Sequence, residues 1–492
     1  MKRAILLFLL LGLVFIVGGF FLGQNALAYR LENTDDVRKI LNEGVDCQGM
    51  DYSALKIAII DEGFPGYSRY KKALGRKLKV YNTLTEVVEV APGSDVDKGA
   101  NSDIDKGEQQ PEVEIIEQPA DFESAGHGFA MAQVMMASSC ALTLPEAKRP
   151  MIYLIPVRSF DTYEKAVNFL IKQKVDIALH SINIDWSSNF DGGGFINTLV
   201  SKATRNGVIW VNSAGNNGKV TYHSDIFQVV GSLQKGEVHL PHDNETLMFE
   251  NFNDDNQLKI TLTWNDFKSD IGYGTSKDLD IRLYRVGAGG KLNRVKESIG
   301  QGEKRQIGRQ AQDAEEAQTS TGNAFEQIRG LVLQKGYYAI KVFLKSDLRD
   351  WSMDDEFRII LSSDQPESVE VLNSINRLNS EITPPADNPS VVTVGVMGAP
   401  FSAQGYTKDR RRKPDVWLSV DPREHGSRYS NASKQLKPID TSDAAALVAG
   451  SILNMKAMDR NLSNENVFSY IRKLKQQQGN PRDVIWQSPQ MR

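Results

Sequence analysis

Buried-strand and amphipathic-helix patterns alternate along most of this chain. Continuous apolar runs of strand length are followed by segments whose apolar residues recur every three or four positions, as in a helix that covers one face of a sheet. This alternation predicts a doubly wound α/β core built on a parallel sheet. The predicted strands are 55–60, 151–157, 175–182, 208–211 and 390–396, and the predicted helices are 130–141, 163–173, 195–205 and 444–455.

A second periodicity interrupts this core. Apolar and polar residues alternate, as in half-buried antiparallel strands, at 258–264, 278–284, 337–343 and 356–363. We therefore predict an antiparallel β-sandwich inserted into the α/β domain. The predicted domains are the first part of the α/β domain at 29–222, the insert at 223–378 and the second part of the α/β domain at 379–492.

A polar, acid-rich stretch at 91–121 follows the first predicted strand and contains the near-repeat SDVDKGANSDIDKGE. Because it is poor in aromatic residues, it buries too little apolar surface to offset chain entropy, and we predict a disordered loop. Its aspartates could bind calcium. A solvated acidic loop is the favoured interpretation, because the spacing lacks the glycine and the terminal glutamate of an EF-hand loop.

The N-terminal segment has the pattern of a signal peptide. Two basic residues precede an apolar run at 4–22, and Ala26-Leu27-Ala28 is a small-x-small cleavage pattern. We predict a signal peptide at 1–28 and export to the periplasm or outside the cell. The apolar run is also long enough to anchor the chain in a membrane if it is not cleaved.

Composition adds two points. The formal net charge is −4 and basic residues are dispersed apart from a short run at 410–413, so nucleic-acid binding is not indicated. The only cysteines are Cys47 and Cys140, which in an oxidising compartment could form a disulfide. Two buried unpaired thiols are an equal alternative, because spacing alone does not give their separation.

Four short polar segments carry candidate chemistry. Asp61 directly follows the first predicted strand, Asn216 follows the strand at 208–211, His127 lies in Gly-His-Gly, and Ser442 precedes the last helix. In parallel sheets, sites form beyond the carboxyl ends of the strands. A carboxylate, an imidazole, an amide donor and a hydroxyl are the groups needed to activate a serine and stabilise an oxyanion. Taken singly, each segment is also an ordinary turn, loop or helix cap.

As an ordered set, these segments resemble the subtilases, the subtilisin-like serine peptidases. IAIIDEG at 57–63 is similar to their aspartate motif, GHGFAMA at 126–132 to their histidine motif, GVIWVNSAGNNG at 207–218 to their asparagine segment, and DTSDAAALVAG at 440–450 to their serine motif. The strand VDIALHSIN at 175–183 and KPDV at 413–416 are further similarities, and the insert resembles a jelly-roll β-sandwich.

The resemblance implies an endopeptidase that acts on proteins or peptides. Ser442 would be the nucleophile, His127 the general base, Asp61 its partner and Asn216 the oxyanion donor. The resemblance also implies substrate binding by Ser181, Ile182, Asn183 and Gly215. No cofactor is implied for the chemistry, and structural calcium is possible without assigned ligands.

The serine motif departs from the family pattern. Asp440 stands where subtilases have glycine, Asp443 where they have methionine, and Ala446 where they have proline. An ionised Asp443 within reach of His127 would favour the imidazolium and shift activity to alkaline pH. Stabilisation of a helix N-terminus by the same acid is an equally good interpretation. These departures keep open an alternative function, a catalytically weak or inactive subtilase-like protein that binds peptides or a partner.

An esterase of the α/β-hydrolase type is a weaker alternative. The chain order Asp, His, Ser and the absence of a G-x-S-x-G segment at Ser442 argue against it.

Overall fold

The computed structural model describes most of the chain after residue 46. The described residues are 47–64, 77–84, 86–90, 126–182, 184–225, 237–238, 246–270, 274–297, 323–363, 368–372, 381–419, 428–429, 436–437, 440–479 and 483–487. The predicted signal peptide at 1–28 and the acidic stretch at 91–121 lie outside them.

An eight-stranded sheet forms the centre of the α/β part of the chain. Its strands are β1 (Lys56–Asp61), β2 (Leu78–Asn82), β3 (Val87–Val90), β4 (Met151–Pro156), β5 (Ile177–His180), β6 (Ile209–Ser213), β17 (Val392–Val396) and β20 (Val416–Leu418). They lie in the order β20-β17-β6-β5-β1-β4-β2-β3, and only β2 and β3 pair antiparallel.

Helices cover both faces of this sheet. The side chains of Ile57 and Ile59 in β1 belong to one core with α4 (His127–Ser138), α7 (Thr441–Met458) and α8 (Asn464–Gln478). The alternate residues Ala58 and Ile60 belong to a second core with α5 (Phe160–Gln173) and α6 (Phe195–Arg205). Successive strand residues point to opposite faces, so an unbroken apolar strand requires a helical layer on each side. The predicted doubly wound α/β fold is confirmed.

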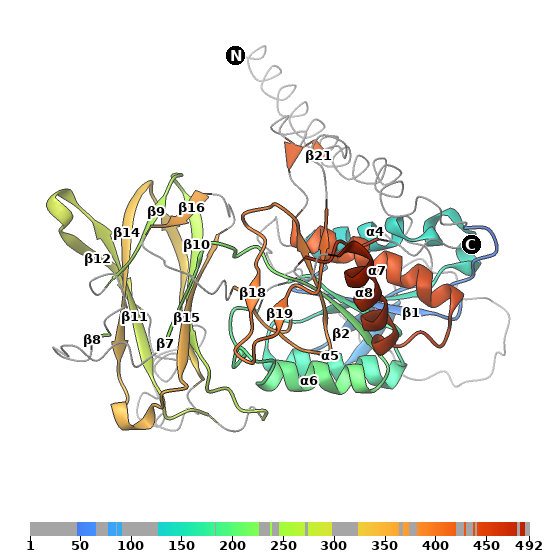
Figure 1. Ribbon diagram of the computed structural model, residues 1–492, viewed down its shortest axis with the longest axis horizontal. Helices are drawn as coiled ribbons and strands as arrows, with labels where there is room; N and C mark the ends of the chain where they lie inside the picture. The colour runs from blue at the N-terminus through green and yellow to red at the C-terminus, as the bar shows by residue number, and fades with distance from the viewer. Residues whose placement is uncertain are drawn as a thin grey trace, which may run out of the picture.

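Two antiparallel sheets lie beside this core, at the left of Figure 1. One has the order β13-β10-β15-β7, built from β7 (Thr221–Asp225), β10 (Asn256–Trp264), β13 (Phe325–Leu333) and β15 (Glu356–Ser363). The other has the order β12-β11-β14-β9-β16, built from β9 (Leu247–Asn251), β11 (Leu279–Val286), β12 (Leu292–Glu297), β14 (Gly336–Leu344) and β16 (Val369–Val371), and β8 (Glu237–Val238) also pairs with β14.

The two sheets share one apolar core, as in a β-sandwich. Ile260 and Ile359 from the first sheet and Phe249 and Leu283 from the second are fully buried in the same cluster. The predicted antiparallel insert is therefore present between β6 and β17, and the domain boundaries stay predictions. Two short pairs, β18 (Gly405–Tyr406) with β19 (Arg412–Lys413) and β21 (Arg428–Tyr429) with β22 (Leu436–Lys437), complete the described strands.

The sandwich is joined to the α/β part by buried contacts. The guanidinium of Arg358 in β15 donates to the backbone carbonyl of Ile382 at 2.7 Å and lies 3.8 Å from the ring centre of Phe190. Trp186 stacks on Phe325 of β13 with ring centres 5.2 Å apart. Aromatic and cationic groups of this kind hold two layers in a fixed arrangement.

Several predicted elements differ from the observed ones. The strand predicted at 175–182 ends at His180, because Ser181 makes polar contacts with the candidate site instead of continuing the sheet. The helix predicted at 130–141 begins at His127 and ends at Ser138. In the α/β part, strands β2, β3 and β20 and helix α8 were not among the predicted elements.

The two cysteines form a disulfide. Cys47 precedes β1, and Cys140 lies in a short 3₁₀ turn, Cys140–Thr143, after α4. The bond closes a loop between residues separated by 93 positions in the sequence. Over the part of the chain that the structure describes, no helix has the length and apolar character needed to cross a membrane.

Candidate active site

Asp61 and His127 are joined by a short hydrogen bond. Asp61 ends β1, and His127 begins α4. The distance between His127 Nδ1 and Asp61 Oδ2 is 2.8 Å. The carboxylate is 1% exposed and also accepts the backbone N–H of Glu62 at 2.8 Å and the hydroxyl of Ser181 at 3.4 Å. A carboxylate held by several donors fixes the orientation of the imidazole.

Gly128 explains why a glycine follows the histidine. A Cβ atom at this position would lie 2.6 Å from the Cβ of Asp61 and 2.6 Å from the ring of Phe64. Any other residue would push α4 away from the end of β1. The absence of a side chain therefore permits the His127–Asp61 contact.

Ser442 occupies the first turn of α7, and its side chain faces the same pocket as His127. Its hydroxyl donates to the backbone carbonyl of Ser181 at 2.8 Å. Among the hydrogen bonds of the described residues, none joins Ser442 to His127. Catalytic hydrogen bonds are often loose without substrate, so rotation of the hydroxyl toward the imidazole is compatible with catalysis.

Thr441 orients the amide of Asn216. The Oδ1 atom of Asn216 accepts the Thr441 hydroxyl at 2.7 Å and the Thr441 backbone N–H at 3.2 Å. Because the oxygen is held by two donors, the Nδ2 donor points elsewhere, and Asn216 lines the pocket. The neighbouring Gly215 donates its N–H to the Thr441 hydroxyl at 3.3 Å and has φ +110°, a conformation that favours glycine.

Four carboxylates lie near His127 and Ser442, those of Asp61, Glu62, Asp440 and Asp443. Burial of the His127 imidazole opposes its protonation, but the charge and hydrogen bond of Asp61 and the charges of Asp440 and Asp443 outweigh burial and raise the pKa of His127 to about 9. Below that pH the imidazole is mostly protonated and is not available as a base. Glu62 lines the same pocket and adds a further negative charge.

Asp440 and Asp443 also cap α7. The Asp440 carboxylate accepts the backbone N–H of Asp443 at 2.9 Å, and the Asp443 carboxylate accepts the backbone N–H of Asp440 at 3.4 Å. Both interpretations given for Asp443 are therefore compatible, since it caps the helix and its charge acts on His127.

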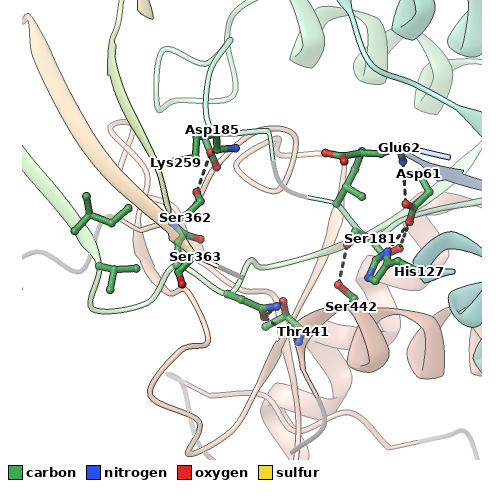
Figure 2. A pocket seen from close by; sticks show the side chains of 15 residues that line it. Asp61, Glu62, His127, Ser181, Asp185, Lys259, Ser362, Ser363, Thr441 and Ser442 are labelled. Carbon is green, nitrogen blue, oxygen red and sulfur yellow. Dashed lines mark hydrogen bonds and ion pairs between the residues drawn. The ribbon is translucent and has the colours of Figure 1, made fainter. Parts of the chain in front are cut away.

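The pocket joins the catalytic candidates to the insert. It has a volume of about 330 Å³, and Figure 2 shows His127 and Asp61 at one side with Lys259, Ser362 and Asp185 at the other. The lining residues are Asp61, Glu62, His127, Ser181, Ile182, Asp185, Asn216, Asn217, Val220, Lys259, Leu361, Ser362, Ser363, Thr441 and Ser442.

The four predicted catalytic candidates line one pocket, with the predicted substrate-binding residues Ser181 and Ile182. Gly215 is buried beside it, and Asn183 lies outside the described residues. Sequence reasoning missed Thr441, although it adjoins Ser442. It also missed Lys259 and Ser362, because the sequence around them does not show that the inserted sandwich contributes side chains to this pocket.

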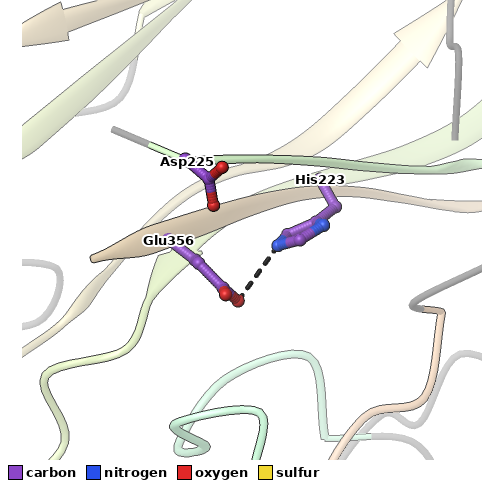
Figure 3. Close-up of side chains that lie close together, drawn as sticks. All are labelled: His223, Asp225 and Glu356. Atoms are coloured by element: carbon purple, nitrogen blue, oxygen red, sulfur yellow. Dashed lines mark hydrogen bonds and ion pairs between the residues drawn. The ribbon is translucent and has the colours of Figure 1, made fainter. Parts of the chain in front are cut away.

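Among the described residues, two groups of side chains have metal-ligand chemistry, and both lie in the sandwich. His223, Asp225 and Glu356 place ligand atoms within 4.8 Å of one another, and Figure 3 shows them on neighbouring strands. The His223 Nε2 to Glu356 Oε2 distance of 3.0 Å makes this group an ordinary ion pair when the imidazole is protonated. The second group is Asp278, Asp280 and Glu326. Neither group lines the pocket of Ser442, and predicted structural calcium stays a prediction.

Residues 53–248 match the model of the subtilase family, and this range contains Asp61, His127 and Asn216. This part of the chain is similar to the subtilase family. A psychrophilic subtilisin-like protease from the Antarctic psychrotroph Pseudoalteromonas sp. AS-11 is a solved structure similar to this chain, with 10% identity, 87% coverage of this chain, 89% coverage of that chain and a TM-score of 0.28. No curated protein sequence matches significantly.

Proposed function

We propose that this protein is an exported subtilisin-like serine endopeptidase that hydrolyses peptide bonds in proteins or peptides. The observation that carries the proposal is the Asp61–His127 hydrogen bond of 2.8 Å at one side of a pocket that Ser442 and Asn216 also line. The family match supports serine peptidase chemistry in general terms.

Each side chain has a role in this proposal. His127, once neutral, takes the proton of the Ser442 hydroxyl as the hydroxyl oxygen attacks the peptide carbonyl, and returns that proton to the leaving amine. Asp61 holds the imidazole tautomer through Nδ1 and stabilises the imidazolium. The Asn216 amide, positioned by Thr441, donates to the oxyanion of the tetrahedral intermediate.

A second candidate function is peptide or partner binding without efficient hydrolysis. It is favoured by the hydrogen bond from Ser442 to the Ser181 carbonyl, since a serine held this way is not aligned on His127. A pKa of about 9 at His127 would further limit hydrolysis at neutral pH.

Incubation of the purified protein with internally quenched peptides distinguishes peptide hydrolysis from peptide binding without hydrolysis. We expect cleavage within the peptides that increases from neutral to alkaline pH and disappears in Ser442→Ala. Tight peptide binding without cleavage at any pH would support the second candidate instead.

Export is a separate part of the proposal. If the predicted signal is cleaved after Ala28, N-terminal sequencing of the protein collected outside the cytoplasm gives Tyr29 as the first residue. A protein that begins at Met1 and stays in the membrane fraction would show that residues 4–22 act as an anchor.

A further inference from the structure

Two neighbouring strands of the sandwich contribute side chains to the pocket. Lys259 in β10 is directly opposite Ser362 in β15 in the antiparallel register, so both side chains lie on the same face of the sheet. The adjoining residues Leu258 and Ile260 belong to the sandwich core, so this face points away from that core. Figure 2 shows Lys259 and Ser362 in the pocket that also contains Ser442.

Asp185, from the segment after β5, fixes these side chains. Its Oδ2 atom is 2.5 Å from Lys259 Nζ and accepts hydrogen bonds from Ser362 Oγ at 3.0 Å and from Thr261 Oγ1 at 3.4 Å. The Asp185 side chain is 1% exposed, whereas the Lys259 side chain is 36% exposed. The ammonium is therefore the more exposed charge of this ion pair.

An ammonium group has three N–H donors, and Asp185 takes one of those of Lys259. The ion pair holds the long lysine side chain in place, which lowers the entropy cost of a further contact. At the other side of the pocket, Asp61 and Glu62 carry negative charge. A substrate carboxylate is therefore attracted at the Lys259 side and repelled at the Glu62 side.

We propose that Lys259, held by Asp185, forms a subsite of this cleft that selects a substrate side chain bearing a carboxylate close to the scissile bond. The proposal rests on the proposed peptidase function and names the substrate class for that site. A basic substrate side chain would be repelled by the Lys259 ammonium, which is the more exposed member of the ion pair. The insert is thus a specificity element of the pocket.

Paired peptides that differ only by glutamate or glutamine test the subsite, since the two side chains have the same shape. Each position flanking the scissile bond is varied in turn, and kcat/KM is measured. At one of these positions we expect glutamate to be preferred by roughly fivefold or more, the effect of one charge pair at about 4 Å in a dielectric as high as that of bulk water. In Lys259→Met that preference is lost.

Two further variants allow for the effect of Lys259→Met on folding, because it leaves the buried Asp185 without its ion-pair partner. The double variant Asp185→Asn with Lys259→Met removes both charges and should also lose the preference. Asp185→Asn alone keeps the ammonium and should retain or increase it. Lys345→Met is a matched control, since Lys345 is 48% exposed and pairs with Asp280 at 3.2 Å beside the other sheet.

Peptide binding to Ser442→Ala, measured by fluorescence anisotropy, separates this proposal from the proposed function. Tighter binding of the glutamate peptide that depends on Lys259 supports the subsite even if the wild type hydrolyses nothing. If kcat/KM and binding are equal for the glutamate and glutamine peptides at every position, or if the double variant retains the preference, the proposed subsite is wrong even if the protein is an active peptidase.

Discussion

Acidic residues around His127 set the pH at which this site can work. Asp61 supplies the hydrogen bond, and Asp440 and Asp443 add charge from the first turn of α7. The pKa of His127 is raised to about 9, so the neutral base predominates only above that pH. We therefore expect kcat/KM to rise with pH through about 9.

Asp443→Asn should lower the midpoint of that rise, because it removes a negative charge that favours the imidazolium while an amide oxygen can still cap α7. The expected decrease is less than about one pH unit, equivalent to about 1.4 kcal/mol, because Asp443 contributes less than Asp61 and Asp440. Asp459→Asn, at the opposite end of the same helix, is the matched control. An unchanged pH–rate profile in Asp443→Asn would disprove the role of this charge.

The Asn216 amide is expected to act in the transition state. Asn216→Ala should lower kcat by roughly 10²–10³-fold, about 2.7–4 kcal/mol, with little change in KM. Thr441→Val should lower kcat by a smaller factor, because it removes the hydroxyl that holds Asn216 Oδ1. Steady-state kinetics of both variants, with Asn206→Ala on the exposed end of α6 as control, provide the check. A loss confined to KM would assign Asn216 to ground-state binding.

At the level of the elements, close contact between α4 and α7 brings His127 and Ser442 to one pocket. A Cβ atom at Gly450 in α7 would lie 1.9 Å from Ser138 Oγ and 2.4 Å from the Met135 carbonyl oxygen in α4. Gly450→Ala should force the helices apart and lower the free energy of unfolding by about 1–3 kcal/mol. Urea unfolding measures this change. An unfolding midpoint equal to that of the wild type would contradict the close packing.

Local patterns predicted the core elements well where burial alone decides the structure. Helix α6 has the predicted bounds Phe195–Arg205, and the five predicted core strands are present as β1, β4, β5, β6 and β17. The short strand β2 was missed because the polar residues Lys79 and Asn82 interrupt its apolar run. The polar groups of Asp61 and Asn216 could be placed because each follows a strand.

Contacts between distant segments could not be predicted in the same way. Lys259 in the sandwich and Asp185 in the α/β part form an ion pair that depends on how the sandwich docks on the core. The alternation of apolar and polar residues in β10 indicates which side chains point away from the sandwich core. It does not indicate which residues these side chains contact. The pairing of Cys47 with Cys140 was open for the same reason.

At the scale of the whole molecule, a buried cation helps to join the sandwich to the α/β core. Arg358 is 2% exposed and lies among the acidic residues Glu356, Glu381 and Asp387. Burial outweighs their attraction and lowers the pKa of Arg358 to about 10, so it remains charged at neutral pH. Its removal would leave the buried carboxylates of Glu381 and Asp387 without this counter-charge.

Arg358→Met should therefore lower the free energy of unfolding by about 3–5 kcal/mol. Arg349→Met is the matched control, because that side chain is 89% exposed and its loss should change stability by less than about 0.5 kcal/mol. Urea unfolding followed by tryptophan fluorescence compares the two. Equal effects of both substitutions would show that the sandwich docks without this cation.

Whether Ser442 is an activated nucleophile is best measured by labelling the purified protein with a fluorophosphonate probe between neutral and alkaline pH. The proposed mechanism predicts covalent labelling of the wild type that increases toward pH 9 and above, and none in Ser442→Ala or His127→Ala. Absence of labelling at every pH, or labelling that persists in Ser442→Ala, would contradict it.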